Sequence, residues 1–446
     1  MSERWFVTPS AGSHDVLVVG GGPAGAACAY WLASAGHDVA LVEKKRFPRV
    51  KTCGDGLTPR AVRQLQDMGL GSALGAHHRF DGLRALAFGR TLELAWPSHP
   101  DFPPYGYVVT RHDLDQLVAE RAEGAGATVW QGAEATDPLV EDGVVRGAMV
   151  KRGGAVEEVR ARQVVVADGA NSRFGRALGT ARDKEWPQGM AIRGYFRSPR
   201  HDEPWIESHL DIRDKAGNVL PGYGWVFPVG DGRVNVGIGL LSTSPRWKAV
   251  NTTHLMEAFV EAVPASWGVS PATSCGPPTG GRLPMGLSVG PRVGPGWLVV
   301  GDAGASINPF NGEGIAYAYE TGRLAAGELG RALVSPGGGL VVDSYRAALE
   351  ERYGLYYRVA RAFVRIIGRP RLMRAMVGTG MHSATLMEWV MRIMANLLRP
   401  DQLGPAEAAY RAVAAIARLA PEPPAPATGL AVGAPALESE PASPAA

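Results

Sequence analysis

Residues 15–27 read Asp-Val-Leu-Val-Val-Gly-Gly-Gly-Pro-Ala-Gly-Ala-Ala, and this stretch decides the fold. The apolar run at 16–19 predicts a buried strand, and the small residues that follow predict a helix packed closely against it. Between them, Gly20, Gly22 and Gly25 have G-x-G-x-x-G spacing. The first glycine allows a tight turn, the second lets the backbone approach a diphosphate, and the third lets the helix meet the strand. The stretch therefore predicts a dinucleotide site at the helix N-terminus.

Three further segments extend this prediction. A second predicted strand, at 38–42, ends in Glu43, 23 residues after Gly20, which is the usual reach for a carboxylate that binds ribose hydroxyls. A glycine-rich turn without a ligand is the alternative, but the strand, the helix and the acidic residue in register favour the nucleotide. Asp168-Gly169 follows another apolar strand, and Gly301-Asp302 follows a third.

The Gly301-Asp302 segment leads through Gly312 and Gly314 into a helix predicted to start near Ile315. An aspartate in that place suits a ribityl hydroxyl or a second diphosphate contact, and the helix N-terminus suits the electron-rich edge of a flavin. The alternative is that Asp302 only caps the helix. Because the earlier motif predicts a nucleotide, we favour the cofactor role.

Composition limits the remaining possibilities. The chain has 446 residues, 46% of them apolar, so it can form two or three domains around sizeable cores. A formal net charge of +3 gives no argument for nucleic acid. The three cysteines are too few and too scattered for a disulfide framework or a metal site, which predicts a reducing, cytoplasmic location. We expect no secretory signal and no membrane-spanning helix, which would need about 18 apolar residues.

The segment at 44–59 combines basic residues with Cys53-Gly54-Asp55-Gly56 and is predicted to be a loop. Because it directly follows the nucleotide-binding strand and helix, it can pass the bound cofactor. The alternatives are a solvated basic loop and a cysteine that merely fills a small buried space. The glycines beside Cys53 favour close approach of the backbone to a ligand.

The predicted fold class is α/β with added helices, in five segments. A Rossmann-like nucleotide-binding domain takes residues 14–180, with a sheet insertion at about 80–110, and residues 286–335. An antiparallel-sheet substrate domain takes 181–285, because strand patterns dominate there. A helical region takes 336–420, and the Pro/Ala-rich tail at 421–446 is expected to be disordered.

The helical region carries an excess of six positive charges between residues 341 and 400. Arginines interleaved with Met, Leu and Trp are compatible with helices lying on a membrane surface. A packed helical domain with a solvated arginine face is the equal alternative. Residues 405–419 predict a further helix with proline at its first position.

Together the nucleotide-binding segments resemble the para-hydroxybenzoate-hydroxylase-like FAD-binding fold. Three finer motifs resemble the geranylgeranyl reductase family: the segments 51–56, 223–228 (Tyr-Gly-Trp-Val-Phe-Pro) and 308–314 (Asn-Pro-Phe-Asn-Gly-Glu-Gly). Within that family, residues 47–70 and 220–244 are most similar to the menaquinone-reductase branch. The likeness covers about residues 14–400, although Thr52 stands where the family commonly has proline.

The resemblance implies a flavoprotein that saturates a carbon–carbon double bond in an isoprenoid chain, which for this branch is the polyprenyl tail of menaquinone. It implies Cys53 as the catalytic residue beside the flavin, and Tyr223 and Trp225 as substrate-cavity residues. It implies that FAD is bound by Gly20, Gly22, Pro23, Ala24, Gly25, Glu43, Lys44, Cys53, Gly54, Asp55, Gly56, Arg111, Asp168, Asp302, Gly312, Gly314 and Ile315.

The chemistry requires a hydride from reduced flavin and a proton, which either Cys53 or water would supply. NAD(P)H or a reduced protein carrier is the expected electron donor, since no second dinucleotide fingerprint is present. A lipid substrate and the basic helices predict peripheral contact with the inner face of the cell membrane. The alternatives are a diphosphate- or pigment-tail reductase, an aromatic monooxygenase on the same fold, and a non-enzymatic FAD-binding protein. A halogenase is less favoured because W-x-W-x-I-P is absent from the sequence.

Overall fold

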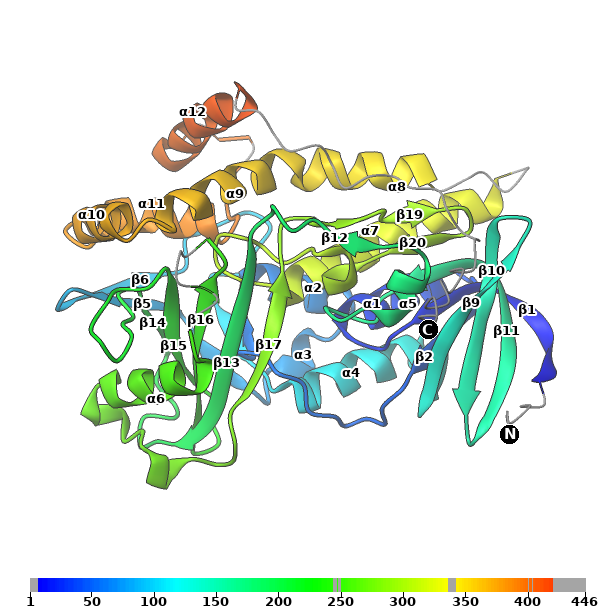
Figure 1. The fold of residues 1–446 in the computed structure, drawn as a ribbon, viewed down its shortest axis with the longest axis horizontal. Coiled ribbons are helices and arrows are strands. Elements are labelled where there is room, and N and C mark those ends of the chain that lie inside the picture. Colours follow the sequence, from blue (N-terminus) through cyan, green and yellow to red (C-terminus); the bar gives the residue numbers. More distant parts are fainter. Residues whose placement is uncertain are drawn as a thin grey trace, which may run out of the picture.

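The computed structural model describes residues 7–243, 247, 250–335, 342–399, 401–402 and 404–419 (Figure 1). Its first sheet has the order β19-β20-β11-β1-β2-β8, with β10 and β9 continuing from β11. The parallel part consists of β1 (Val7–Val19), β2 (Val39–Glu43), β8 (Thr128–Gln131), β11 (Ala155–Val166) and β20 (Trp297–Val299). The antiparallel part consists of β19 (Val293–Gly294), β9 (Ala133–Glu141) and β10 (Val144–Arg152).

Strand β1 is apolar without interruption because both of its faces are covered. Val16 and Val18 pack in a core with the helices α1 (Pro23–Ser34), α4 (Arg111–Gly124) and α7 (Ile315–Val334). Leu17 and Val19 face the opposite core, which includes residues of β9 and β10. The helices therefore cover one face of the sheet, and the β9–β11 extension contributes to the core on the other.

The second sheet has seven strands in the order β17-β13-β16-β15-β14-β5-β6. They are β5 (Gly82–Ala87), β6 (Arg90–Ala95), β13 (Gln188–Arg197), β14 (Trp205–His209), β15 (Gly222–Pro228), β16 (Arg233–Leu241) and β17 (Thr279–Pro284). The pairs are antiparallel except β14 with β5, which run parallel. One face packs on α6 (Thr252–Ala262) around Phe259 and Trp267.

Smaller elements connect the two sheets. They are β3 (Gly56–Leu57), α2 (Pro59–Asp67), α3 (Gly71–Leu74), β4 (His78–Phe80), β7 (Gly106–Val108), α5 (Arg173–Ala177), β12 (Ala181–Arg182) and β18 (Val289–Gly290). Short 3-10 turns lie at η2 (Ala265–Trp267), η3 (Pro271–Thr273) and η4 (Gly301–Gly304). Strands β3, β7 and β4 form a small sheet directly after the Cys53 loop.

The C-terminal helices are α8 (Val342–Leu349), a π-helical turn (Glu350–Gly354), α9 (Leu355–Ile367), α10 (Pro370–Gly380), α11 (Ala384–Met394) and α12 (Pro405–Leu419). Figure 1 shows them running along one side of the molecule, with α10 and α11 at one end. Within the described ranges, the structure contains no helix that is long and apolar enough to cross a bilayer.

Most predicted elements are confirmed, including the α/β class, the helix that starts at Ile315 and the helix at 405–419. Three details differ. The residue patterns at 156–160 and 163–166 predict two short strands, but these residues form one strand, β11, and the pattern does not predict β9. The second sheet is not wholly antiparallel, because the predicted insertion at about 80–110 supplies β5 and β6 to its edge. The domain boundaries stay a prediction, and the tail at 421–446 lies outside the described residues.

Candidate active site

The turn after β1 has the shape that the glycine spacing predicts. Gly20 has φ of +106°, and a Cβ on Gly25 would lie 1.9 Å from the Gly20 carbonyl oxygen. Gly22 differs, since a Cβ there would find only Arg49 Nη2, at 3.8 Å. Helix α1 starts at Pro23, and no side chain of the described ranges caps it. Gly20 and Gly25 thus allow helix α1 to pack closely on the turn after β1. Gly22 instead leaves space for a diphosphate beside the N–H groups at the start of α1.

Glu43 lies at the end of β2 with its carboxylate turned back to this turn. The Gly21 N–H donates to Oε2 at 3.0 Å and the Lys45 N–H donates to Oε1 at 2.9 Å. Arg49 Nη2 lies 3.4 Å from Oε2. A buried carboxylate held in this way is suited to accept ribose hydroxyls.

A buried ion cluster joins α4 to the loop after β2. Arg111 donates to Asp115 through Nε at 2.6 Å and Nη2 at 2.9 Å, and Arg49 Nη1 reaches the same carboxylate at 2.9 Å. The Nε atom of Arg49 is buried with no hydrogen-bond partner in the described structure, so the cluster retains an unused donor. Arg49 lies beside the glycine turn, and a guanidinium group in that place suits an anionic cofactor. Asp115 was not predicted, although an acidic residue four positions after Arg111 on a helix could have indicated it.

The backbone around Cys53 is held from the second sheet. Its carbonyl oxygen accepts from Arg193 Nε at 3.1 Å and from Asn235 Nδ2 at 2.9 Å. Asp55, which is fully buried with φ of +66°, accepts from Asn235 Nδ2 at 2.8 Å and from the Tyr195 hydroxyl. Arg193, Tyr195 and Asn235 were missed, since alternating strand residues of this kind are common on any sheet.

Burial raises the pKa of the Cys53 thiol, and the nearby Asp55 raises it further, while Arg111 acts in the opposite direction. Burial also raises the pKa of Asp55, which Tyr195 and Arg193 partly oppose. The cysteine therefore favours its protonated form. It is present as a neutral thiol and is not suited to act as a thiolate nucleophile.

An aromatic row on β15 links two predicted site loops. The Tyr223 hydroxyl donates to the Asn311 carbonyl at 2.6 Å, and Trp225 Nε1 donates to Asn235 Oδ1 at 3.0 Å. Phe227 lies against Gly54 and Gly56, where added Cβ atoms would come within 3.4 and 3.1 Å of its ring. The row thus runs from the Gly312 loop to the Cys53 loop, and brings the predicted substrate residues to the predicted flavin residues.

Asp302 lies in η4 at the end of β20, beside the start of α7. A Cβ on Gly314 would be 3.4 Å from Asp302 Oδ1, and one on Gly301 would be 2.6 Å from Ala24 Cβ, so η4 packs between the two helix N-termini. Gly314 is the N-cap of α7, and within the described chain no side chain bonds that cap, so Asp302 does not cap the helix. Burial raises the pKa of Asp302, whereas Arg111 and Lys51 lower it.

Two predicted cofactor residues, Asp168 and Lys44, make no hydrogen bond or ion pair with another predicted site side chain in the described part of the chain. Both carboxylate oxygens of Asp168 accept bonds within its own turn, from the Ser172 hydroxyl and from the Phe174 N–H at 3.0 Å. Only its backbone adjoins the glycine turn, where a Cβ on Gly20 would lie 3.0 Å from Asp168 Cα. Lys44 is exposed. Their contacts with FAD stay predictions.

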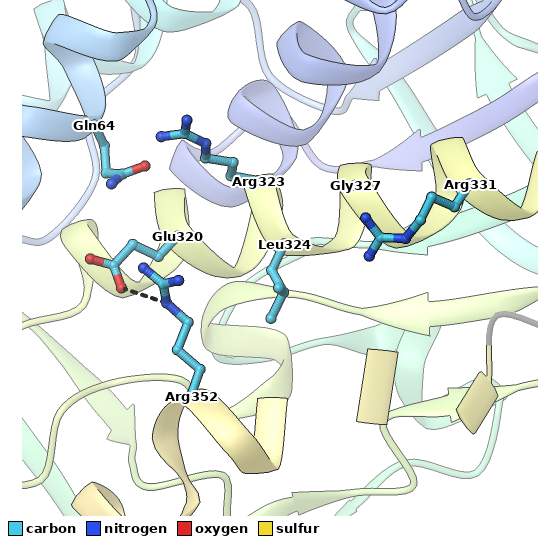
Figure 2. A pocket seen from close by; sticks show the side chains of 7 residues that line it. All are labelled: Gln64, Glu320, Arg323, Leu324, Gly327, Arg331 and Arg352. Carbon is cyan, nitrogen blue, oxygen red and sulfur yellow. Dashed lines mark ion pairs between the residues drawn. The ribbon is translucent and has the colours of Figure 1, made fainter. Parts of the chain in front are cut away.

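A separate pocket of about 200 Å³ lies along α7 (Figure 2). Its charged lining includes Arg323, Arg331 and Arg352 around Glu320. These arginines pair with acidic groups: Arg323 with Asp67 at 2.6 Å, and Arg352 with Glu320 at 4.0 Å. The residues that line it include none of the predicted site residues, so we do not place the reaction there.

Comparisons with known proteins show which proteins this chain is similar to. Residues 13–221 match the family model described as FAD binding domain. The chain is 43% identical over 394 residues to "Menaquinone reductase" of Mycolicibacterium smegmatis, covering 87% of this chain and 92% of that protein. It is 34% identical over 322 residues to "Digeranylgeranylglycerophospholipid reductase 1" of Methanopyrus kandleri, covering 70% of this chain and 79% of that protein.

Solved structures show the same fold. A geranylgeranyl bacteriochlorophyll reductase-like protein of Thermoplasma acidophilum superposes with a TM-score of 0.72 at 24% identity, covering 86% of this chain and 99% of that one. A flavin-dependent brominase superposes with a TM-score of 0.71 at 20% identity, covering 91% and 100%. At these identities the likeness supports the fold alone.

The fold and the site define an FAD-dependent oxidoreductase with the para-hydroxybenzoate-hydroxylase-like architecture. Three features fit FAD: the free space at Gly22, the buried Glu43 carboxylate beside the glycine turn, and the Arg49 Nε atom, which has no hydrogen-bond partner among the described residues. The chain belongs to the geranylgeranyl reductase family, in the branch that contains the menaquinone reductases.

Proposed function

We propose that this protein saturates a carbon–carbon double bond in the polyprenyl tail of menaquinone. The observation that carries the proposal is the aromatic row Tyr223–Trp225–Phe227, which joins the Cys53 loop to the loop before α7. An isoprenoid tail has only apolar surface and the π electrons of its double bonds for a protein to recognise. Aromatic rings can pack against both. The menaquinone reductases among the relatives support the choice of tail.

Bound FAD, once reduced, supplies the hydride. The residues of this chain bind and orient the tail, exclude water and hold a proton. The polar atoms of Tyr223 and Trp225 are used in contacts with the protein, so in this proposal the tail meets their rings. The Cys53 thiol, kept protonated by burial, positions the reacting bond or supplies a proton.

The direct test is lipid mass spectrometry of cells with and without this protein. We expect a menaquinone pool heavier by two hydrogen atoms per molecule only when the protein is present. An unchanged pool would contradict the proposal. A shift confined to an isoprenoid diphosphate or a pigment would favour the diphosphate- or pigment-tail reductase, and oxygen uptake in step with NADPH would favour the monooxygenase.

Cys53 is tested separately by Cys53→Ser in purified enzyme with bound FAD. We expect FAD content to stay the same and tail reduction to fall at least about tenfold, because the thiol's proton or position is lost. Cys28→Ser, a buried cysteine in α1, is the control and should leave turnover unchanged. Full turnover by Cys53→Ser would show that this cysteine has no part in the reaction.

The electron donor in this proposal is NAD(P)H or a reduced protein carrier that binds transiently. Anaerobic mixing of the FAD-loaded protein with NADH, NADPH or a reduced ferredoxin should bleach the flavin absorbance with one of them. If none reduces the flavin within the turnover time, both donors are wrong.

A membrane contact completes the proposal, through a patch from the end of α9 to α10. Its exposed apolar members are Ile366, Leu372 and Met376, at 44%, 42% and 44% exposure. Exposed arginines surround them: Arg365, Arg369, Arg371 and Arg374. Exposed apolar groups among arginines suit the surface of an anionic bilayer.

Cosedimentation with anionic vesicles at low salt tests this contact. We expect wild-type protein to bind and Leu372→Asp/Met376→Asp to bind at least about tenfold more weakly, because apolar burial is lost and two negative charges are added. Val413→Asp, on α12, is the matched control. Equal binding of all three proteins would contradict the proposed patch.

A further inference from the structure

A glutamate that the proposed mechanism does not use lies inside the loop before α7. Glu313 stands between Gly312 and Gly314, two of the predicted flavin residues. Its backbone is fixed on both sides, since its N–H donates to Asn311 Oδ1 at 3.0 Å and its carbonyl accepts from the Asn308 N–H at 2.9 Å. The carboxyl group therefore has a defined place at the α7 N-terminus.

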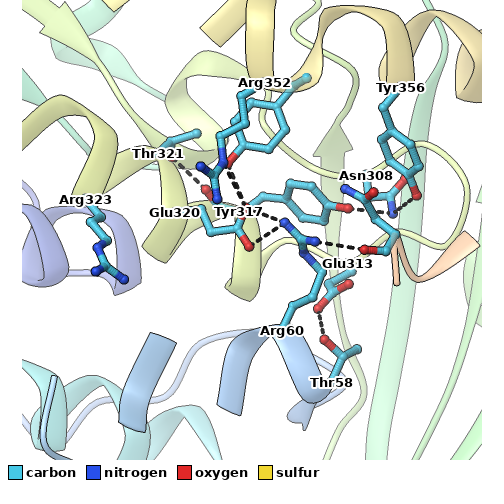
Figure 3. A network of polar contacts seen from close by, with 12 residues as sticks. Thr58, Arg60, Asn308, Glu313, Tyr317, Glu320, Thr321, Arg323, Arg352 and Tyr356 are labelled. Atoms are coloured by element: carbon cyan, nitrogen blue, oxygen red, sulfur yellow. Dashed lines mark hydrogen bonds and ion pairs between the residues drawn. The ribbon is translucent and has the colours of Figure 1, made fainter. Parts of the chain in front are cut away.

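The two oxygens of this carboxyl group have different surroundings (Figure 3). Oε1 accepts a hydrogen bond from the hydroxyl of Thr58, the residue at the N-cap of α2. Oε2 is buried and finds no hydrogen-bond partner among the described residues. An ionised carboxylate with one oxygen buried and unpaired is costly, so this geometry favours the neutral acid.

Glu313 also lies between the two halves of the proposed site. Thr58 ends the segment that begins at Cys53, and Asn311 carries the carbonyl that accepts from Tyr223. A Cβ on the adjacent Gly312 would lie 3.7 Å from the Tyr223 hydroxyl. The acid is thus next to the aromatic row and next to the predicted flavin contacts at once.

The charged groups around Glu313 come from several elements. Burial is the largest influence on the pKa of Glu313 and raises it, the Thr58 hydroxyl and Arg60 on α2 lower it, and Glu320 on α7 raises it; the resulting pKa is about 7. Arg60 is largely committed to Glu320, whose carboxylate it contacts at 2.7 Å, and to the Asn396 carbonyl at 2.8 Å. The hydroxyl groups of Tyr223 and Tyr317 also lie near Glu313. Burial raises the pKa of each above the ordinary value of tyrosine, so both stay neutral.

We propose that Glu313 is the proton donor of the tail reduction. This inference rests on the proposed function. One alkene carbon takes the hydride from reduced FAD, and the other forms a new C–H bond as the Glu313 O–H bond breaks. The carboxylate that remains takes a proton from water before the next turnover. The reducing equivalents are those of the proposed electron donor, so the step is balanced.

Glu313 suits this role better than Cys53 does. A general acid works best when its pKa is near the working pH. Burial raises the pKa of the Glu313 carboxyl group into the neutral range. It also raises the pKa of the Cys53 thiol, which moves that pKa further above the neutral range. Cys53 then acts by positioning the tail, and the two residues have separable effects.

The test is single turnover of FAD-loaded, photoreduced enzyme with menaquinone, measured from about pH 5.5 to 8.5. For wild type we expect the rate to fall as pH rises through about 7, because the acid form is lost there. Glu313→Gln should lose at least about 100-fold in rate and lose this pH dependence, with FAD content unchanged. Glu313→Asp should restore part of the rate.

Thr58→Val gives an independent test that keeps the acid in place. The hydroxyl stabilises the carboxylate, so its removal should shift the midpoint of the pH profile upward. Glu328→Gln, further along α7, makes the same charge change where the carboxylate pairs with the exposed Arg331, and its profile should match wild type. If Glu313→Gln fails to fold, the Thr58→Val profile decides: an unchanged midpoint overturns the inference.

The outcomes separate the two proposals. If wild type reduces no menaquinone tail, the proposed function fails. If wild type reduces the tail and Glu313→Gln does so at the wild-type rate with the wild-type pH profile, only the role of Glu313 fails.

Discussion

The glycine turn at 20–25 and the Cys53 loop at 53–56 both belong to the proposed flavin site, yet different contacts hold them. The turn is held by its own backbone: Gly25 packs on Gly20, and the Gly20 N–H donates to the Val42 carbonyl at 2.8 Å in the adjacent strand. The loop is held by polar side chains of β13 and β16, which lie 140 to 182 residues away in the sequence.

This difference separates two tasks. Every FAD presents the same diphosphate, so a short turn of fixed geometry is sufficient to bind it. In the proposed function the reacting end must match a particular substrate, and the Cys53 loop is attached to the sheet that carries the aromatic row. The Arg193–Asn235–Asp55 contacts make the position of Cys53 depend on that sheet.

The sharpest test of the turn is Gly25→Ala, for which we expect the largest effect. A Cβ there would lie 1.9 Å from a backbone oxygen, so the strand and helix must separate, at a cost of at least about 3 kcal/mol in the free energy of unfolding. Chemical denaturation and the FAD content of the purified protein measure it. Gly22→Ala is the control: it should fold normally and bind FAD weakly, because only the cofactor would contact the new methyl group.

For the Cys53 loop the corresponding change is Asp55→Ala. It leaves the Tyr195 hydroxyl, Asn235 Nδ2 and the Arg111 N–H without their shared acceptor, which should cost about 2–3 kcal/mol. Unlike the turn variant, it should retain much of its FAD while tail reduction falls. Tyr195→Phe removes one donor and should cost about 1 kcal/mol. Loss of FAD in step with activity would mean that the two regions are not separable.

A loss of stability as small as that of Tyr195→Phe is expected for Tyr223→Phe, at the junction of the two loops. It removes one hydrogen bond to the Asn311 carbonyl, so we expect about 1 kcal/mol of destabilisation, unchanged FAD binding and a raised KM for the lipid. Steady-state kinetics with menaquinone in detergent measure the KM. A wild-type KM with a lowered kcat would instead assign the hydroxyl to the chemical step.

The same contrast explains which predictions from the sequence were confirmed. The strand at 16–19, the helix that follows and the acidic residue at 43 depend on neighbouring residues and on hydrophobic burial on both faces of a strand. The apolar residues at 386, 390, 393 and 397 recur at helical spacing, and the helix is confirmed as α11. Its buried side differs in part: Met387 and Met391 are buried along with Leu397, whereas Leu386 is 36% exposed. Side chains there pack on β5 and β6, whose position the local pattern does not give.

The sequence by itself determined the nucleotide-binding turn, the α/β class and the family, because spacing and apolar runs act over short distances along the chain. Only the tertiary structure decided that residues 82–95 extend the second sheet, that Arg193 and Asn235 hold Cys53, and that Thr58 bonds Glu313 across 255 residues. These contacts join segments far apart in sequence, and their geometry exists only once both sheets are formed and their shared loops are buried.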